Sequence, residues 1–234
     1  MRQVPQNPVF TAIDKNDLGV AKGLGAELGS ISGGIKLGKE FFTAHGPSGI
    51  LDVVGKTTPL FLDLKFHDIP NTVAGAVRSA TKAMSPNMMT IHASGGPAMI
   101  RAASDAASEF EVAPWILAVT VLTSMDDADL NAIGVSADTQ DQVLRLAALA
   151  QANGATGAIC SPLEIAAIRR ECGPDFKLVV PGIRPAGSDH GDQKRVKTPI
   201  EALQDGADYL VIGRPITGAS NPAAAATDII AGLS

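Results

Sequence analysis

Four charged residues of alternating sign lie where apolar segments of this sequence end. Asp63, Lys65 and Asp68 follow one apolar run, and Lys36 lies near the end of an earlier run. An ammonium group between carboxylates can stabilise negative charge that develops on a substrate and then protonate it. Lone buried charges are costly, and charges that served stability alone would cost less on outer helices. We therefore predict a catalytic array, with a salt-bridge network at the rim as the alternative.

A second set of residues is suited to binding an anion. Gly213-Arg214 follows the last apolar run, and the glycine-rich segment 182–195 contains Arg184 and Gln193. Arginine offers a forked donor, and glycine lets the backbone approach an anion closely. Taken alone, a Gly-Arg pair equally describes a turn that carries a solvated arginine.

Eight short apolar runs are the elements that must position these groups. Most are continuous rather than alternating, which is typical of parallel strands covered by helices. Helix starts are signalled by Ser161-Pro162, Thr198-Pro199 and Asn221-Pro222, each a capping residue before a proline. The expected strands are 9–14, 33–38, 59–65, 88–93, 116–122, 156–160, 177–183 and 208–213.

This pattern predicts an α/β fold, a (β/α)8 TIM barrel formed as a single domain by residues 1–234. An open doubly wound sheet is the alternative, but no Gly-x-Gly-x-x-Gly turn follows the first strand. Alternation in 59–65 places three leucines under the helices and turns Asp63 and Lys65 into the barrel mouth. Asp14, Thr123 and His92 also come at or just after strand ends. The long segments 123–138 and 184–198 are expected to be functional loops.

Composition limits the partners. The net charge of −5 and the 4% aromatic content give no reason to expect binding to nucleic acid or to an anionic membrane. Cys160 and Cys172 lack metal-like spacing and are interpreted as structural thiols. The cysteine spacing therefore gives no reason to expect a metal site. Residues 1–6 lack an apolar signal core, so a cytoplasmic protein is expected.

One segment resembles a family signature. The run from Phe61 to Thr72 (FLDLKFHDIPNT) resembles the signature of the orotidine 5′-phosphate decarboxylase family. Further motifs occur in the family's order, and the resemblance covers nearly the whole chain. They are Ile35-Lys36-Leu37-Gly38, Leu122-Thr123-Ser124, Pro181-Gly182-Ile183-Arg184, Asp192-Gln193 and Val211-Ile212-Gly213-Arg214.

The resemblance implies a reaction and a homodimer. It implies conversion of orotidine 5′-monophosphate to uridine 5′-monophosphate and CO₂ in pyrimidine biosynthesis, without a cofactor. Lys65 would protonate a carbanion-like intermediate beside Asp63. Lys36 and Asp68 would complete the catalytic array, with Asp68 and Thr72 reaching into the neighbouring subunit's site.

The resemblance also implies the substrate contacts. Asp14 and Lys36 would hold the ribose hydroxyls, and Thr123 would contact the pyrimidine. The phosphate would be bound by Gln193, Gly213 and Arg214, with Arg184 nearby on a closing loop.

Two other functions remain open at this stage. One is a Mg²⁺-dependent decarboxylase or aldolase for keto-sugar phosphates, which would share the Asp-x-Lys-x-x-Asp segment. Such enzymes carry a glutamate near the end of the second strand, where this sequence has Lys36. The other is a non-catalytic barrel that binds a nucleotide phosphate, for which the lysine–aspartate array would be unnecessary.

Overall fold

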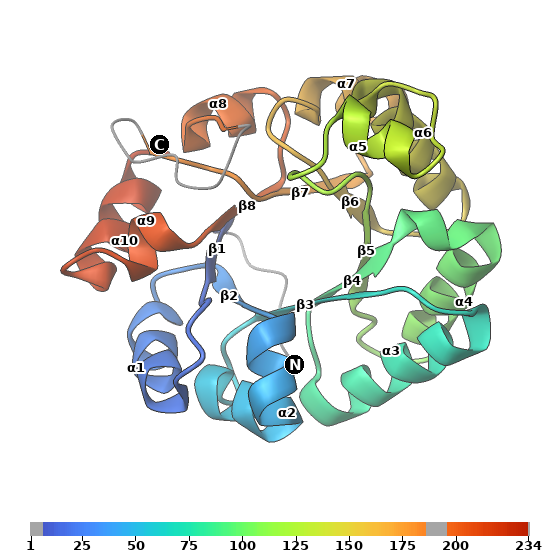
Figure 1. The fold of residues 1–234 in the computed structure, drawn as a ribbon. Coiled ribbons are helices and arrows are strands. Elements are labelled where there is room, and N and C mark those ends of the chain that lie inside the picture. Colours follow the sequence, from blue (N-terminus) through green and yellow to red (C-terminus); the bar gives the residue numbers. More distant parts are fainter. Residues whose placement is uncertain (1–6, 186–195, 234) are drawn as a thin grey trace.

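The chain folds into a closed barrel of eight parallel strands (Figure 1). The computed structural model describes residues 7–185 and 196–233. Each strand pairs with its sequence neighbours, and β8 pairs with β1 to close the barrel. The predicted (β/α)8 architecture and all eight strands are confirmed. Their bounds are β1 Val9–Ala12, β2 Gly34–Gly38, β3 Leu60–Phe66, β4 Met88–His92, β5 Trp115–Val119, β6 Gly157–Ile159, β7 Lys177–Val180 and β8 Tyr209–Ile212.

Helices form a ring outside the strands (Figure 1). α2 contains a kink at Gly46, whose φ of 60° precedes Pro47, because a residue before proline avoids helical geometry. The described helices are α1 Leu18–Leu28, α2 Lys39–Val54, α3 Pro70–Met84, α4 Gly96–Ser108, α5 Asp127–Ala132, α6 Thr139–Ala152, α7 Ile165–Cys172, α8 Pro199–Gln204, α9 Arg214–Thr217 and α10 Pro222–Ala231, with a short 3₁₀ helix at Ala93–Gly95. None of them is long and apolar enough to cross a membrane.

Two of the three predicted helix starts are confirmed. Thr198 caps α8 in a reciprocal capping box, and Asn221 caps α10. The prediction at Ser161 is wrong, because α7 begins only at Ile165. There the Glu164 carboxylate accepts the Ser161 backbone N–H at 2.7 Å, and residues 162–164 form a turn instead of a first helical turn.

The two long segments have different outcomes. Segment 123–138 is not a plain loop, since it contains α5, which Asp126 caps. Segment 184–198 includes residues 186–195, which lie outside the described residues. Its two described ends lie together, because the Arg184 backbone N–H donates to the carbonyl of Lys197 at 3.0 Å.

The core has two layers, one inside the barrel and one between strands and helices. Leu60, Leu62 and Leu64 belong to the outer layer, while Phe61 belongs to the inner one. This confirms the predicted alternation of β3. The inner layer consists of Phe10, Ala12, Phe61, Met88, Leu117, Val179, Tyr209 and Val211. These side chains fill the barrel, so the chemistry is confined to its carboxyl-terminal mouth.

Candidate active site

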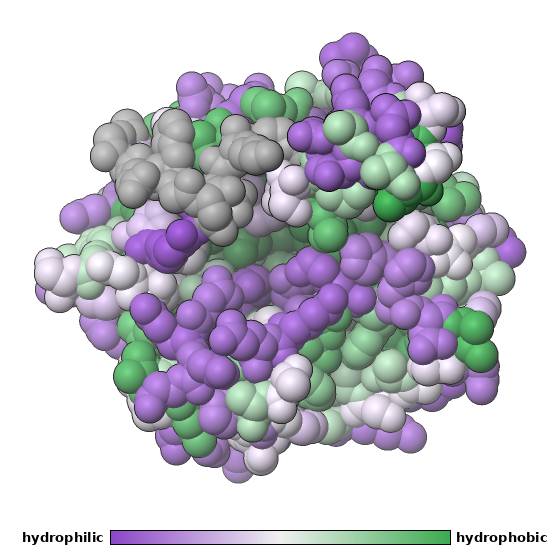
Figure 2. All heavy atoms as spheres, in the orientation of Figure 1, coloured by the Kyte–Doolittle hydropathy of each residue, from purple (hydrophilic) through white to green (hydrophobic). Residues whose placement is uncertain are grey.

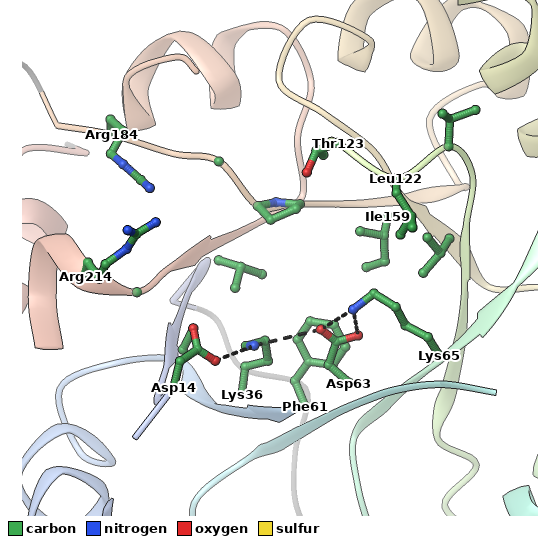
Figure 3. A pocket seen from close by; sticks show the side chains of 17 residues that line it. Asp14, Lys36, Phe61, Asp63, Lys65, Leu122, Thr123, Ile159, Arg184 and Arg214 are labelled. Carbon is green, nitrogen blue, oxygen red and sulfur yellow. Dashed lines mark hydrogen bonds and ion pairs between the residues drawn. The ribbon is translucent and has the colours of Figure 1, made fainter. Parts of the chain in front are cut away.

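Four charged side chains form a row across one side of the barrel mouth (Figure 3). Lys36 Nζ lies 3.0 Å from Asp14 Oδ1 and 3.9 Å from Asp63 Oδ2. Lys65 Nζ lies 2.8 and 2.7 Å from the two oxygens of Asp63. The sign of charge alternates along the row, with Asp14 at the end where the sequence prediction had Asp68. Asp63 is the shared partner of both ammonium groups.

A backbone irregularity directs Lys65 toward Asp63. The register of β3 on β4 moves from Leu62–Met89 to Phe66–Ile91, so four residues of β3 span two of β4. Within this bulge the backbone of Lys65 has a φ of 52°, a conformation that residues other than glycine rarely adopt. Such strain is maintained only where the surroundings fix it, and it is typical of functional sites.

Asp63 is held in its charged form. Burial raises its pKa, but the Lys36 and Lys65 ammonium groups and hydrogen bonds from Lys65 and Thr90 lower it more, so the net pKa is below the ordinary value. Its side chain is only 15% exposed, against 64% for Asp14. Asp63 is therefore the buried carboxylate of the row, whereas the Asp14 carboxylate at the end of the row is exposed to solvent.

The row borders a cavity of about 250 Å³ at the barrel mouth. Figure 2 shows this end of the molecule, where hydrophilic side chains gather along one side of a hollow that also has hydrophobic walls. Thr123 lines the cavity, as predicted. Its apolar lining comes from Ala12, Phe61, Val119, Val121, Leu122, Ile159, Pro181 and Val211. A flat, largely apolar group with polar edges would fit such a wall.

Two arginines lie on the side of the cavity away from Lys65 (Figure 3). Arg184 is 8% exposed, and its Nη1 donates to the Ile183 carbonyl at 2.9 Å. Arg214 is the first residue of α9 and directly follows Gly213. Both guanidinium groups line the cavity with Gly213, so the predicted anion-binding residues that the structure describes are brought together. The predicted Gln193 lies outside the described residues.

Asp68 and Thr72 do not join the row. Both are exposed, and neither lines the cavity. Asp68 accepts the backbone N–H of Ile69 at 2.6 Å, just before α3. Ile69 is itself 67% exposed. Within one chain, the predicted catalytic array therefore contains Lys36, Asp63 and Lys65, but not Asp68.

His92 lies at the end of β4 but does not line the cavity. Its ring lies against His67, with 5.3 Å between ring centres. Burial, His67 and the nearby Lys39 and Lys65 lower its pKa to about 4, so it is neutral at physiological pH. Among the described residues, no group of three or more His, Cys, Asp or Glu side chains is arranged to hold a metal ion.

Comparison with protein families agrees with this geometry. The model of the "Orotidine 5'-phosphate decarboxylase / HUMPS family" matches residues 7–229. The chain belongs to this family. A relative from Paramagnetospirillum magneticum named orotidine 5′-phosphate decarboxylase is 55% identical over 97% of this chain and 98% of its own length. A relative of the same name from Rhodospirillum rubrum is 54% identical over 99% of this chain and 96% of its own length.

The solved structure of another protein named orotidine 5′-phosphate decarboxylase confirms the barrel architecture. The crystal structure of orotidine 5′-phosphate decarboxylase from Lactobacillus acidophilus superimposes with a TM-score of 0.86. The two chains are 36% identical, and the match covers 98% of this chain and all of that one. The family resemblance noted in the sequence is confirmed, together with the enzyme class, a carbon–carbon lyase.

Sequence reasoning missed the apolar wall of the cavity, which includes Val119 and Val121, and one buried partner of Asp63. Val119 and Val121 line the cavity, and the alternation of β5 would have identified them, because Leu117 on the same face points into the barrel. Thr90, which hydrogen-bonds Asp63, was also missed. Its inward position follows from the alternation Met88, Thr90, His92, but a threonine inside a barrel strand gives no chemical signal by itself.

Proposed function

We propose that the chain decarboxylates orotidine 5′-monophosphate to uridine 5′-monophosphate and CO₂, and that Lys65 supplies the proton. The observation that carries this proposal is the Lys65 ammonium held on both oxygens of Asp63 at a cavity wall. An ammonium fixed in a partly buried place stabilises an adjacent developing anion without reorganising at the moment of reaction.

The chemistry assigned to Lys65 balances within the site. The bond between the pyrimidine ring and its carboxylate breaks, and the electron pair remains on the ring carbon while CO₂ leaves. The Lys65 ammonium then donates a proton to that carbon, and the resulting amine regains a proton from water. Asp63 keeps the ammonium oriented, and its own charge lies near the substrate carboxylate, which contributes ground-state repulsion.

The remaining substrate contacts are proposed from the family resemblance, and the lining of the cavity supports them. Arg184, Gly213 and Arg214 line its far side, where we place the phosphate. Gln193, which lies outside the described residues, is proposed as a further phosphate ligand. Asp14 and Lys36 would hold the ribose hydroxyls between the two ends, and Thr123 would contact the pyrimidine. The phosphate is remote from the reacting carbon. Its binding energy can therefore be used to close the site over the substrate and to exclude water from the reacting groups.

The Mg²⁺-dependent alternative is disfavoured by Lys36. Its ammonium lies between Asp14 and Asp63, so a covalently attached cation already occupies the place between these two carboxylates that a metal ion would need. The non-catalytic alternative leaves the strained Lys65 backbone without a purpose, because phosphate capture on the arginine side does not require it.

We further propose a homodimer whose subunits share their sites. Asp68 and Thr72 are exposed beside an exposed Ile69, so they are available to a second subunit. The cytoplasmic location also remains a prediction. Mixing Lys65→Ala with Asp68→Ala subunits would create heterodimers with one complete site each. Recovered turnover in the mixture supports shared sites, whereas no recovery after verified subunit exchange contradicts them.

The direct test is a spectrophotometric assay of orotidine 5′-monophosphate loss by the purified chain. We expect full turnover without an added cofactor and with EDTA present. Activity on a keto-sugar phosphate that EDTA abolishes would support the Mg²⁺-dependent alternative instead. Nucleotide binding with no turnover of either substrate would support the non-catalytic one.

A further inference from the structure

Thr90 lies on β4, opposite the bulge of β3 that contains Asp63 and Lys65. It lies in the middle of β4 and is completely buried. Its Oγ1 accepts the backbone N–H of Lys65 at 2.8 Å, where the irregular register between β3 and β4 displaces regular strand pairing. The Thr90 side chain thus serves as the acceptor for a backbone group that would be costly to leave unpaired.

The same hydroxyl also holds Asp63. Thr90 Oγ1 donates to Asp63 Oδ1 at 2.9 Å, while it accepts from Lys65. A hydroxyl has one hydrogen to donate, and here that hydrogen is directed to the carboxylate. One oxygen atom therefore connects the strained backbone of the proton donor to the anion that orients its ammonium group.

We propose that Thr90 is a positioning residue for proton delivery by Lys65. This inference rests on the proposed decarboxylation. The Thr90 hydroxyl fixes the Lys65 backbone and the Asp63 carboxylate relative to each other, so that the ammonium meets the ring carbon at which charge develops. It does not touch the substrate, since it is absent from the cavity lining. Its removal therefore affects the chemical step more than nucleotide binding.

Substitutions can separate this role from a merely structural one. Thr90→Val removes the hydroxyl at nearly constant volume, and Thr90→Ser retains it. Thr90→Ala completes a second pair, since serine and alanine differ only by the hydroxyl. Thr11→Val is the matched control, because Thr11 is equally buried. Its Oγ1 lies 2.6 Å from Ser32 Oγ, and Ser32 is not part of the charged row.

We expect Thr90→Val to lower kcat about 100-fold with KM and the affinity for uridine 5′-monophosphate nearly unchanged, since small misplacements of a reacting group have effects of this size. Thr90→Ser should recover most of the loss. Losing the hydroxyl also removes one interaction that lowers the Asp63 pKa. The acid limb of the kcat/KM profile should therefore move to higher pH. Thr11→Val should destabilise the fold while leaving kcat and the pH profile unchanged.

The outcomes separate this inference from the proposed function. If the unmodified chain does not convert orotidine 5′-monophosphate, the proposed function fails, and the role of Thr90 fails with it. If the unmodified chain is active and Thr90→Val keeps its kcat and pH profile, the inference alone is overturned. A serine variant as slow as the alanine variant also overturns it. Should Thr90→Val not fold, the serine and alanine pair decides the matter.

Discussion

Replacing Asp63 with asparagine removes the central anion of the row while preserving its shape. Lys36 would keep its contact with Asp14, 3.0 Å away, but Lys65 would lose its carboxylate partner. Breaking a buried ion pair costs about 3–5 kcal/mol. Because the Lys65 side chain is 25% exposed and is partly hydrated, we expect the lower end, about 3 kcal/mol. At about 2–4 °C per kcal/mol for a chain of this size, Tm should fall by roughly 6–12 °C.

Asp14→Asn provides the matched control. Asp14 lies closer to Lys36 than Asp63 does, but its side chain is 64% exposed. Exposed pairs contribute about 0–1 kcal/mol, so this variant should barely change Tm. Thermal unfolding followed by circular dichroism compares the two. Equal losses of stability would refute the reasoning that the buried Asp63 carboxylate contributes more than the exposed Asp14 carboxylate.

The pH dependence gives a second check on Asp63. Its folded pKa is lower than the ordinary 3.8, so its stabilisation is complete above that value and is lost as pH falls through the folded pKa. The difference in unfolding free energy between the unmodified chain and Asp63→Asn should be constant from pH 7 to 5. In urea titrations it should shrink only below about pH 4. A difference that already declines between pH 7 and 5 would contradict this assignment.

Two other predictions concern the anion side and the barrel wall. Arg214→Ala should weaken uridine 5′-monophosphate binding about 10- to 150-fold, the effect of losing a charged hydrogen bond of roughly 1.5–3 kcal/mol. Calorimetry with uridine should show no change, and equal losses for both ligands would contradict a phosphate contact. Gly157→Ala should destabilise the fold by about 3 kcal/mol, because an added Cβ would lie 2.1 Å from the Lys177 carbonyl oxygen. Gly23→Ala, with nothing within 4 Å of the added Cβ, should instead stabilise α1 by about 0.5–1 kcal/mol in the same denaturation assay.

The barrel and most of the site could be predicted from the sequence because both depend on local patterns. Continuous apolar runs identified the strands, and alternation in β3 placed Asp63 on the inner face, where the structure has it. Charges at the ends of parallel strands meet at one mouth, so Asp14, Lys36 and Asp63 were placed together without any knowledge of tertiary contacts.

The features that we did not predict depend on local geometry that the hydrophobic periodicity of the sequence does not show. The bulge at Lys65 shifts the pairing register of β3 on β4, and Thr90 becomes part of the site through a side-chain contact across the two strands. At Ser161 only half of the capping box forms: the Glu164 carboxylate accepts the Ser161 backbone N–H, but the Ser161 hydroxyl makes no hydrogen bond with the described residues, and the helix begins later. α5 has only six residues, too few to show a helical period, although its Asp126 capping box was a readable signal.

Turnover by Lys65→Ala is the most direct test of the central claim, that the ammonium held on Asp63 protonates the substrate. Single-turnover decarboxylation of orotidine 5′-monophosphate should collapse in this variant, while calorimetry shows the affinity for uridine 5′-monophosphate largely kept. Decarboxylation by Lys65→Ala at the rate of the unmodified chain would remove Lys65 from the mechanism and contradict the account.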